Sequence, residues 1–337
     1  MTSVQVSRSL LEPVGRARVM GVINATPDSF SDGGTYATAV DAVRAGLAMV
    51  ADGADIVDVG GESTRPGAGR VDRAEELRRV LPVVTELAAA GVAVSVDTTR
   101  STVAEAALTA GAAIINDVSG AADRDLLAIA AEWAVPYVLM HARGVSANMS
   151  ARAVYGDVVS EVVAELRERL DVVFAAGIAP ERVIVDPGIG FAKKSRHNWT
   201  LLAHMDAIAA LGYPLLVGTS RKSFLGSLLA DADGRPRPAG DRDDATQATT
   251  ALLAAEGVWA VRVHAVRAAA DAVRVAQAWR DAREQRTRPA GSGPAPARGA
   301  SVGPDSVGPD SAGPDSAGPD SAGPACGALR LPPAGAV

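Results

Sequence analysis

Two kinds of segment, one short and apolar and the other longer and amphipathic, alternate along residues 16–285 of this chain. Short apolar runs rich in Val and Ile, such as 17–23 (ARVMGVI) and 182–187 (RVIVDP), are followed by longer Ala-rich stretches that also carry charges. Short continuous apolar runs are typical of strands buried on both faces of a parallel sheet, and the longer stretches have helical periodicity. The pattern therefore predicts repeated strand–helix units. The predicted strands are 17–23, 55–60, 92–97, 112–117, 136–141, 182–187, 214–218 and 259–264.

Helices are predicted between these strands, and glycines stand where helix C-caps belong. Eight strand–helix units in roughly 270 residues favour an α/β fold, a (β/α)8 TIM barrel formed by a single domain. The alternative is an open doubly wound sheet. The even spacing of the eight units favours the barrel. No strand–helix turn carries G-x-G-x-x-G, which argues against a dinucleotide-binding sheet. The main predicted helices are 37–51, 73–90, 102–110, 157–176, 198–210 and 265–285, with Gly91, Gly111, Gly177 and Gly212 as caps.

The two ends of the chain differ from this body. Residues 1–15 form an N-terminal extension without the apolar centre of a signal peptide. Residues 286–337 contain repeats of SVGPD and SAGPD, with almost no large apolar side chain, which predicts a disordered C-terminal tail. A period of five excludes collagen. No apolar run approaches the roughly 20 residues that span a bilayer, so no membrane partner is expected.

Composition narrows the possible partners. The net charge of -6 argues against broad nucleic-acid binding, although a small basic pocket for an anionic ligand stays possible. Cys326 is the single cysteine, so a disulfide within the chain and a cysteine metal cluster are both excluded. This cysteine usage suits a reducing cytoplasm.

Polar residues close nearly every predicted strand. In a (β/α)8 barrel the C-terminal ends of the strands share one face, where active sites are built. Each residue alone would more simply be a strand cap or an ion-pair partner. Together at one face they indicate a polar ligand or a satisfied polar network, because unpaired buried polar groups cost stability. These residues are Asn24, Asp58, Asp97, Asn116, Asp117, His141, Asp186, Arg262 and His264, with Lys222 after the seventh strand.

The residue types suggest what is bound. Asp97, Asn116 and Asp186 supply acceptors and an amide, and Lys222 a donor, which suits a flat heterocycle with several ring N–H groups.

A second set of residues suits phosphate. Arg65, Arg262 and His264 are cationic or donor groups of the kind that bind phosphate oxygens. Asn24 and the loop carboxylates Asp28 and Asp32 are hard oxygen ligands that could hold Mg²⁺ on that phosphate.

Seven motifs occur in a fixed order, namely VMGVINATPDSFSDGG, DIVDVGGESTRPGA, SVDTTR, INDVSG, DPGIGFAK, GTSRKSF and RVH. Together they closely resemble dihydropteroate synthase over residues 16–285 and leave out the tail. The resemblance implies a TIM-barrel transferase of folate biosynthesis. It would join 6-hydroxymethyl-7,8-dihydropterin pyrophosphate to p-aminobenzoate, giving 7,8-dihydropteroate and pyrophosphate with Mg²⁺ as cofactor. A cytoplasmic homodimer inhibited by sulfonamides is also implied.

The resemblance also implies a role for each site residue. The pterin would be held by Asp97, Asn116, Asp186 and Lys222. Pyrophosphate would be held by Asn24, Arg65, Arg262 and His264. The p-aminobenzoate site would be shaped by Phe30, Thr64, Pro66, Phe191 and Ser223. The metal would meet Asn24 and Asp32, and catalysis would rest on Asp97, Asp186, Lys222, Arg262 and His264.

Two positions depart from the family pattern. Ala265 stands where Asp is usual, and Ala142 stands where a bulkier residue is common. Neither is a predicted site residue, so these departures affect the expected shape of the pocket and leave the expected activity unchanged. A non-catalytic pterin-binding paralogue is a further possibility, and so is a pterin-dependent methyltransferase barrel. The methyltransferase would not need Lys222 or the Arg262–His264 pair, and both are present.

Overall fold

The computed structural model describes residues 10–25, 39–62, 71–144 and 149–287. Eight parallel strands follow the order β6-β5-β4-β3-β2-β1-β8-β7. A single parallel bridge between Val185 and Leu215 joins β6 to β7 and completes the circle. The predicted TIM barrel and all eight strands are thus confirmed. The strands are β1 (Arg18–Asn24), β2 (Ile56–Gly60), β3 (Val94–Asp97), β4 (Ile114–Asp117), β5 (Tyr137–Met140), β6 (Val183–Asp186), β7 (Leu216–Val217) and β8 (Ala260–Val263).

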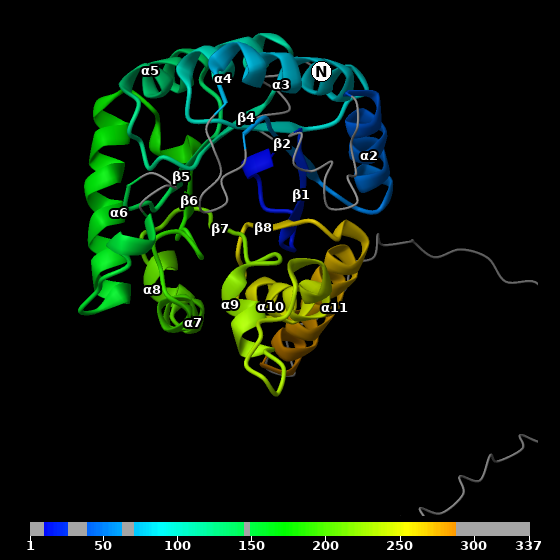
Figure 1. Ribbon diagram of the computed structural model, residues 1–337, viewed down its shortest axis with the longest axis vertical. Helices are drawn as coiled ribbons and strands as arrows, with labels where there is room; N and C mark the ends of the chain where they lie inside the picture. Colours follow the sequence, from blue (N-terminus) through cyan, green and yellow to red (C-terminus); the bar gives the residue numbers. More distant parts are fainter. Residues whose placement is uncertain (1–9, 26–38, 63–70, 145–148, 288–337) are drawn as a thin grey trace, which may run out of the picture. The chain divides into compact units, whose positions relative to one another are not determined.

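Helices surround the strands, as Figure 1 shows. The helix predicted over 198–210 is two helices, because the backbone at His204 leaves the helical region with φ -130° and ψ 42°. The cap glycines are confirmed, since Gly91, Gly111 and Gly177 take φ values of +79°, +109° and +95°. The helices are α2 (Ala39–Ala51), α3 (Arg73–Ala89), α4 (Ser101–Thr109), α5 (Arg124–Trp133), α6 (Val158–Ala175), α7 (Ser195–Ala203), α8 (Met205–Ala209), α9 (Ser223–Leu228), α10 (Asp243–Ala255) and α11 (Val266–Thr287), with short 3-10 turns η2 (Met149–Arg152), η3 (Pro180–Arg182) and η4 (Ala239–Arg242). No described helix is long and apolar enough to cross a membrane.

The chain divides into the units Met1–Pro289 and Ala290–Val337. Helix α11 ends at Thr287, slightly beyond the predicted end of the body at Gln285. The whole second unit lies outside the described residues, and so does nearly all of the predicted tail.

Strand alternation builds two apolar layers. Side chains facing outward, such as Val57 and Val59, pack with Val80 and Leu87 of α3 in the shell between strands and helices. The inward-facing side chains form a separate cluster that fills the barrel at the N-terminal ends of its strands. This inner cluster, called the plug below, consists of Leu10, Met20, Ile56, Ala113, Ile114, Val138, Ile184, Leu216, Trp259 and Ala260.

The N-terminal segment belongs to this plug. Leu10 is 9% exposed, and its carbonyl accepts a hydrogen bond of 3.1 Å from Trp259 Nε1. Burying a leucine side chain contributes about 1.5–3 kcal/mol. The Arg18 guanidinium lies 5.6 Å from the centre of the Trp259 ring. Part of the predicted N-terminal extension therefore closes the N-terminal end of the barrel.

Candidate active site

The register of the sheet brings the predicted strand-end residues to one level. Asn24 is paired with Gly60, Gly60 with Asp97, and Asp97 with Asn116. On the other side of the barrel, Met140 of β5 is paired with Asp186 of β6. The C-terminal ends of these strands therefore form one rim, as the sequence predicted.

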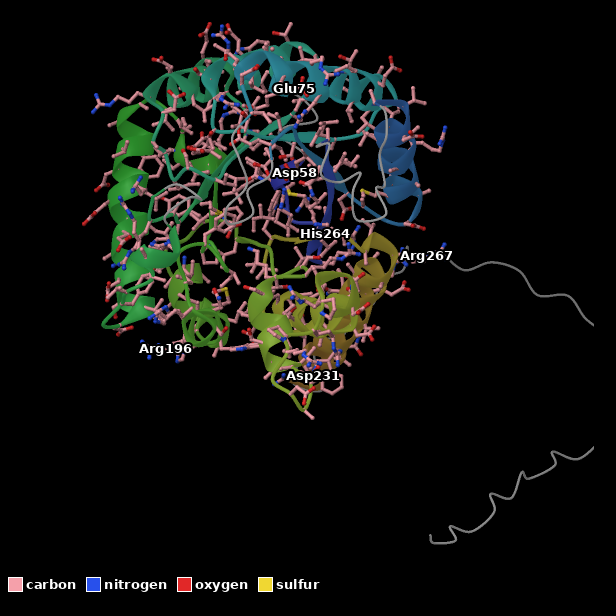
Figure 2. All side chains as sticks on the ribbon, in the orientation of Figure 1. Asp58, Glu75, Arg196, Asp231, His264 and Arg267 are labelled. Atoms are coloured by element: carbon pink, nitrogen blue, oxygen red, sulfur yellow. The ribbon has the colours of Figure 1, made fainter. Side chains whose placement is uncertain are left out.

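Directly above the plug, the inward-facing side chains change from apolar to polar. Asp58, Asn116 and Asp186 each follow a plug residue by two positions, so they point to the same interior. Asp58 is 0% exposed and Asn116 2% exposed, so this polar layer is enclosed by the barrel. Asp58 and His264 lie inside the ring of helices, whereas Arg196 lies at its outer edge (Figure 2).

Arg262 joins this layer across the barrel. Its Nε donates to Asp58 Oδ2 at 2.7 Å, and its Nη2 donates to Asp97 Oδ2 at 2.8 Å. Asn116 Nδ2 donates to the same Asp58 oxygen at 3.0 Å. One cation thus serves two buried carboxylates. Asp58 Oδ1 is buried and has no partner among the described residues, so it can accept a hydrogen bond from a ligand.

Burial moves the pKa values of Asp97, Asp186 and Lys222 toward neutrality. Removal from water raises the pKa of Asp97 to about 7, against the opposing effect of Arg262. Burial also raises the pKa of Asp186, although Lys222 opposes this. Lys222 is partly exposed, yet loss of water around its ammonium lowers its pKa to about 8. Acids and a base with such shifted pKa values in one cleft are typical of a functional site.

The loop after β6 carries further predicted site residues. Asp186 Oδ1 accepts a 2.7 Å hydrogen bond from the Gly188 amide. The carbonyl of Ile189 accepts a hydrogen bond from Lys222 Nζ, which lies 4.9 Å from the centre of the Phe191 ring. Gly188 has φ +66°, and a Cβ atom there would lie 2.1 Å from the His141 carbonyl oxygen, so only glycine fits. The loop therefore links Asp186 to Lys222.

A strained turn presents Lys222. The preceding residue, Arg221, has φ +58°, which is uncommon for a residue with a side chain. Its guanidinium binds both Asp243 oxygens at 2.7 Å, and its carbonyl accepts a 2.8 Å hydrogen bond from Arg242. These contacts with α10 and the turn before it hold the strained backbone in place.

His264 is oriented by the same turn. The Ser220 hydroxyl lies 2.8 Å from His264 Nδ1 and accepts a 3.2 Å hydrogen bond from the His264 amide. Since that hydroxyl accepts from the amide, it can donate to Nδ1, which leaves the ring proton on Nε2. Ser223 begins α9 and is exposed. Asn24 ends β1 at the rim.

The remaining predicted site residues lie outside the part of the chain that the structure describes. They are Asp28, Phe30, Asp32, Thr64, Arg65 and Pro66.

The sequence predicted Asp58 among the strand-end residues but assigned it no ligand, and it assigned no role to Lys193 or Glu165. Counting by two from Ile56 places Asp58 inside the barrel. Lys193 and Glu165 had no such signal, because their partner His141 lies 52 and 24 positions away. Asp117, by contrast, is occupied structurally, since it accepts hydrogen bonds from Tyr137 Oη at 2.6 Å and from two backbone amides.

The metal prediction rests on Asn24 and Asp32, of which only Asn24 is described. No group of three or more His, Cys, Asp or Glu side chains suited to a metal occurs within the described ranges. Mg²⁺ usually takes one or two protein oxygens and completes its shell with water and substrate phosphate. A rim position with a hard oxygen, such as that of Asn24, fits this kind of binding.

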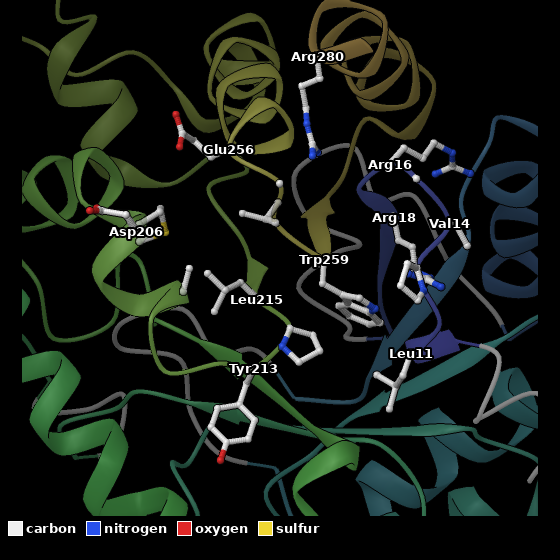
Figure 3. A pocket seen from close by; sticks show the side chains of 17 residues that line it. Leu11, Val14, Arg16, Arg18, Asp206, Tyr213, Leu215, Glu256, Trp259 and Arg280 are labelled. Carbon is white, nitrogen blue, oxygen red and sulfur yellow. The ribbon is translucent and has the colours of Figure 1, made fainter. Parts of the chain in front are cut away.

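A cavity of about 600 Å³ lies at the opposite end of the barrel (Figure 3). Its walls include Arg18 at the start of β1, Leu215 just before β7 and Trp259 just before β8. No residue predicted for the active site lines it. This cavity is therefore separate from the buried charges of the candidate site.

A closed (β/α)8 barrel with paired buried acids, an amide and two cations at its C-terminal rim defines a barrel enzyme for a polar, donor-rich ligand. Residues 20–264 match the family described as Pterin binding enzyme, and the chain belongs to that family.

Named relatives agree with this family. The chain is 55% identical over 264 residues to the dihydropteroate synthase of Mycobacterium leprae (strain TN). The aligned residues cover 78% of this chain and 93% of the relative. The Xanthomonas albilineans dihydropteroate synthase solved with 4-aminobenzoic acid has a TM-score of 0.72 and 45% identity, covering 78% and 93% of the two chains. The Yersinia pestis dihydropteroate synthase solved with a sulfonamide drug has a TM-score of 0.75 and 38% identity, covering 80% and 96%.

Proposed function

We propose that this chain catalyses dihydropteroate synthesis as a transferase of folate biosynthesis. It joins 6-hydroxymethyl-7,8-dihydropterin pyrophosphate to p-aminobenzoate and releases pyrophosphate. The observation that carries the proposal is the buried layer of Asp58, Asp97, Asn116 and Arg262, with Asp186 and Lys222 beside it. The match to the Pterin binding enzyme family and the named relatives support the same reaction.

The polar layer suits a pterin ring. A pterin presents several N–H donors along one edge, and Asp58 Oδ1, Asp97 and Asp186 offer carboxylate acceptors. Lys222 supplies a donor for a ring acceptor. Charge-assisted hydrogen bonds in a site that excludes water are roughly twice as strong as neutral ones. We therefore assign the pterin to Asp97, Asn116, Asp186 and Lys222, with Asp58 as an additional acceptor.

The reaction exchanges two bonds at the methylene carbon of the pterin. The C–O bond to pyrophosphate breaks, and its electron pair leaves with the pyrophosphate. The lone pair of the p-aminobenzoate nitrogen forms the new C–N bond, and that nitrogen then loses a proton. Positive charge that develops on the ring is stabilised by Asp97 and Asp186, so no protein nucleophile is required.

Pyrophosphate departs on the cationic side of the site. Arg262 uses Nε and one Nη for Asp58 and Asp97, so its other Nη group has protons left for a phosphate oxygen. His264 offers Nε2–H when Ser220 donates to Nδ1. Asn24 and Arg65 complete the proposed pyrophosphate site. We propose that Asn24 and Asp32 hold Mg²⁺, which when bound neutralises charge on the leaving group.

The p-aminobenzoate site is proposed next to Lys222. Phe191 lies against the Lys222 ammonium, and Ser223 follows Lys222 at the start of α9. By family resemblance, Phe30, Thr64 and Pro66 supply the remaining wall. A sulfonamide shares the shape of p-aminobenzoate and should compete with it there.

We further propose that two copies of the chain associate through α10 and α11. These helices pack against each other, and each presents large apolar side chains to solvent. Val275 and Trp279 are one turn apart on α11 and are 66% and 65% exposed, and Leu252 on α10 is 68% exposed. Trp279→Glu should yield a monomer in sedimentation.

We place the enzyme in the cytoplasm because a chain with one cysteine suits a reducing compartment.

The test is a turnover assay on the full chain. Pyrophosphate release from the pterin substrate is measured with and without p-aminobenzoate, and 7,8-dihydropteroate is identified by mass. Release that depends on p-aminobenzoate, falls in excess chelator, and is inhibited by a sulfonamide in competition with p-aminobenzoate is expected. Pyrophosphate release without p-aminobenzoate, or tight pterin binding without any turnover, would contradict the proposal. Full turnover in chelator would overturn the Mg²⁺ assignment alone.

A further inference from the structure

A buried lysine holds the loop after β6, behind the candidate site. Lys193 is 9% exposed. Its Nζ is 2.9 Å from His141 Nδ1, 3.0 Å from the Gly188 carbonyl oxygen and 3.1 Å from the Phe191 carbonyl oxygen. Burial lowers the pKa of Lys193 to about 7, against the opposing effect of Asp186. In the ammonium form the group has three protons, and these three acceptors use all of them. Lys193 therefore has no proton left for a ligand.

His141 connects this lysine to helix α6. Because Lys193 donates to Nδ1, the proton of the neutral His141 ring must be on Nε2, and it points at Glu165 Oε2, 3.0 Å away. Burial and the nearby Lys193 lower the pKa of His141 to about 4, so the ring is neutral at pH 7. Arg143 Nε donates to Glu165 at 2.9 Å, which fixes the carboxylate that orients His141.

The segment that Lys193 binds is the same loop that supports Lys222. Gly188 and Phe191, whose carbonyls Lys193 binds, lie on either side of Ile189 and Gly190 in the sequence. Ile189 supplies the carbonyl for Lys222 Nζ, and Phe191 supplies the ring beside it. The backbone here is irregular, with φ +66° at Gly188, +83° at Gly190 and +47° at Ala192. Such a loop depends on side-chain contacts to keep one conformation.

We propose that Lys193 is a positioning residue that acts through this loop to orient Lys222 and Phe191 for the synthase reaction. The inference rests on the proposed function. His141 and Glu165 take part by fixing the direction of the Lys193 ammonium. Small errors in the placement of reacting groups cost large factors in rate, so loss of this support should reduce turnover without removing any group that touches substrate.

The first experiment compares Lys193→Met with Lys194→Met. Lys194 is the next residue and is exposed, so it controls for loss of a lysine at this point of the chain. We expect Lys193→Met to lower kcat/KM for p-aminobenzoate by about 10- to 100-fold, and Lys194→Met to change it less than about twofold. Melting temperature is recorded for each variant, and rates are measured well below it. Wild-type turnover by folded Lys193→Met would overturn the proposal.

The second experiment asks whether Lys193 acts through Lys222. The change Lys193→Met is made in wild type and in Lys222→Met, and residual turnover is compared. If Lys193 works by holding the loop against Lys222, its loss should lower the rate of the Lys222→Met enzyme by less than about threefold. If the two losses of rate multiply in full, Lys193 does not act through Lys222, and the proposed positioning of Lys222 by Lys193 is overturned.

A pair of substitutions at His141 keeps the test valid if Lys193→Met does not fold. Asn places a side-chain oxygen near the position of Nδ1, so His141→Asn retains an acceptor for Lys193, whereas His141→Leu does not. We expect the Asn enzyme to keep at least about a third of wild-type kcat/KM and the Leu enzyme to lose about tenfold or more. Equal losses would overturn the proposal. Inactive wild type would instead contradict the proposed function.

Discussion

The two ends of the barrel are built from the same strands and differ in chemistry. At the N-terminal end, Met20, Ile56 and Ile184 fill the interior, with Leu10 and Trp259 packed against them. Two residues further along the strands, the interior holds the layer of buried acids, amide and arginine. At the first end the Trp259 ring N–H is paired with the Leu10 carbonyl, and the Arg18 guanidinium stacks on the Trp259 ring. At the second a buried carboxylate oxygen of Asp58 lacks a partner within the described residues.

This contrast separates the contributions to stability from those to chemistry. Apolar filling favours folding at any pH and with any ligand. Buried charges stabilise only when they are well paired, and their use is in binding and reaction. Substitutions at the polar end should therefore change binding and rate more than matched substitutions at the apolar end.

The largest difference is expected between two arginines. Arg262→Met leaves the buried Asp58 and Asp97 carboxylates without their shared cation, which should abolish measurable turnover and lower the free energy of unfolding by about 3–5 kcal/mol. Arg16 pairs with Asp55 at the N-terminal end, and its side chain is 35% exposed. Arg16→Met should cost about 1 kcal/mol or less and keep turnover.

The check is chemical denaturation of both variants beside the turnover assay. Asp58→Asn combined with Arg262→Met should recover part of the lost stability, because one buried charge is removed. Equal losses of stability for the two arginine variants would show that the two ends do not differ as described.

The next effect concerns pterin affinity. Asp186→Ala removes a buried acceptor of charge-assisted hydrogen bonds, worth about 1.5–3 kcal/mol, so affinity for a pterin should fall about ten- to hundredfold. Asp206→Ala, in the wall of the N-terminal cavity, is the matched control and should leave affinity unchanged. Titration calorimetry measures both. Unchanged affinity in Asp186→Ala would exclude Asp186 from the pterin site.

A smaller effect is expected from pH. With a pKa of about 7, Asp97 becomes protonated as pH falls and ceases to be a charged acceptor, so kcat/KM for the pterin substrate should decrease below pH 7. Lys222, with a pKa of about 8, loses its proton as pH rises, so kcat/KM should decrease again above pH 8. Asp97→Asn should lower the maximum and remove the acidic decrease. An acidic decrease that persists in Asp97→Asn would assign it to another group.

The smallest effect is expected from the tail. Removing residues 290–337 should change the melting temperature and turnover very little, because this segment lacks the large apolar side chains needed to join a core. Removing residues 1–11 should, by contrast, lower the melting temperature, since Leu10 belongs to the plug. Thermal unfolding of the two truncations decides this. A marked loss of stability without 290–337 would contradict the tail prediction.

Much of the fold could be predicted because buried parallel strands read as short apolar runs, as in 92–97 and 182–187. The rim residues followed from the rule that barrel sites lie at the C-terminal ends of strands. The contact of Arg262 with Asp58 and Asp97 spans 204 and 165 positions, and no local pattern encodes it. The break at His204 was missed for another reason, because the apolar periodicity continues through it while the backbone turns.

The single bridge between β6 and β7 gives the barrel a weak point. Every other neighbouring pair of strands shares a ladder of backbone hydrogen bonds, whereas in the described part of the chain β6 and β7 are joined by one bridge, between Val185 and Leu215. The loops above this junction carry Phe191 and Lys222. Local opening needs the least free energy where the fewest hydrogen bonds must break, so the barrel should open transiently between β6 and β7. The side of the barrel below Phe191 and Lys222 can then open locally to admit a substrate, while the other strands stay paired.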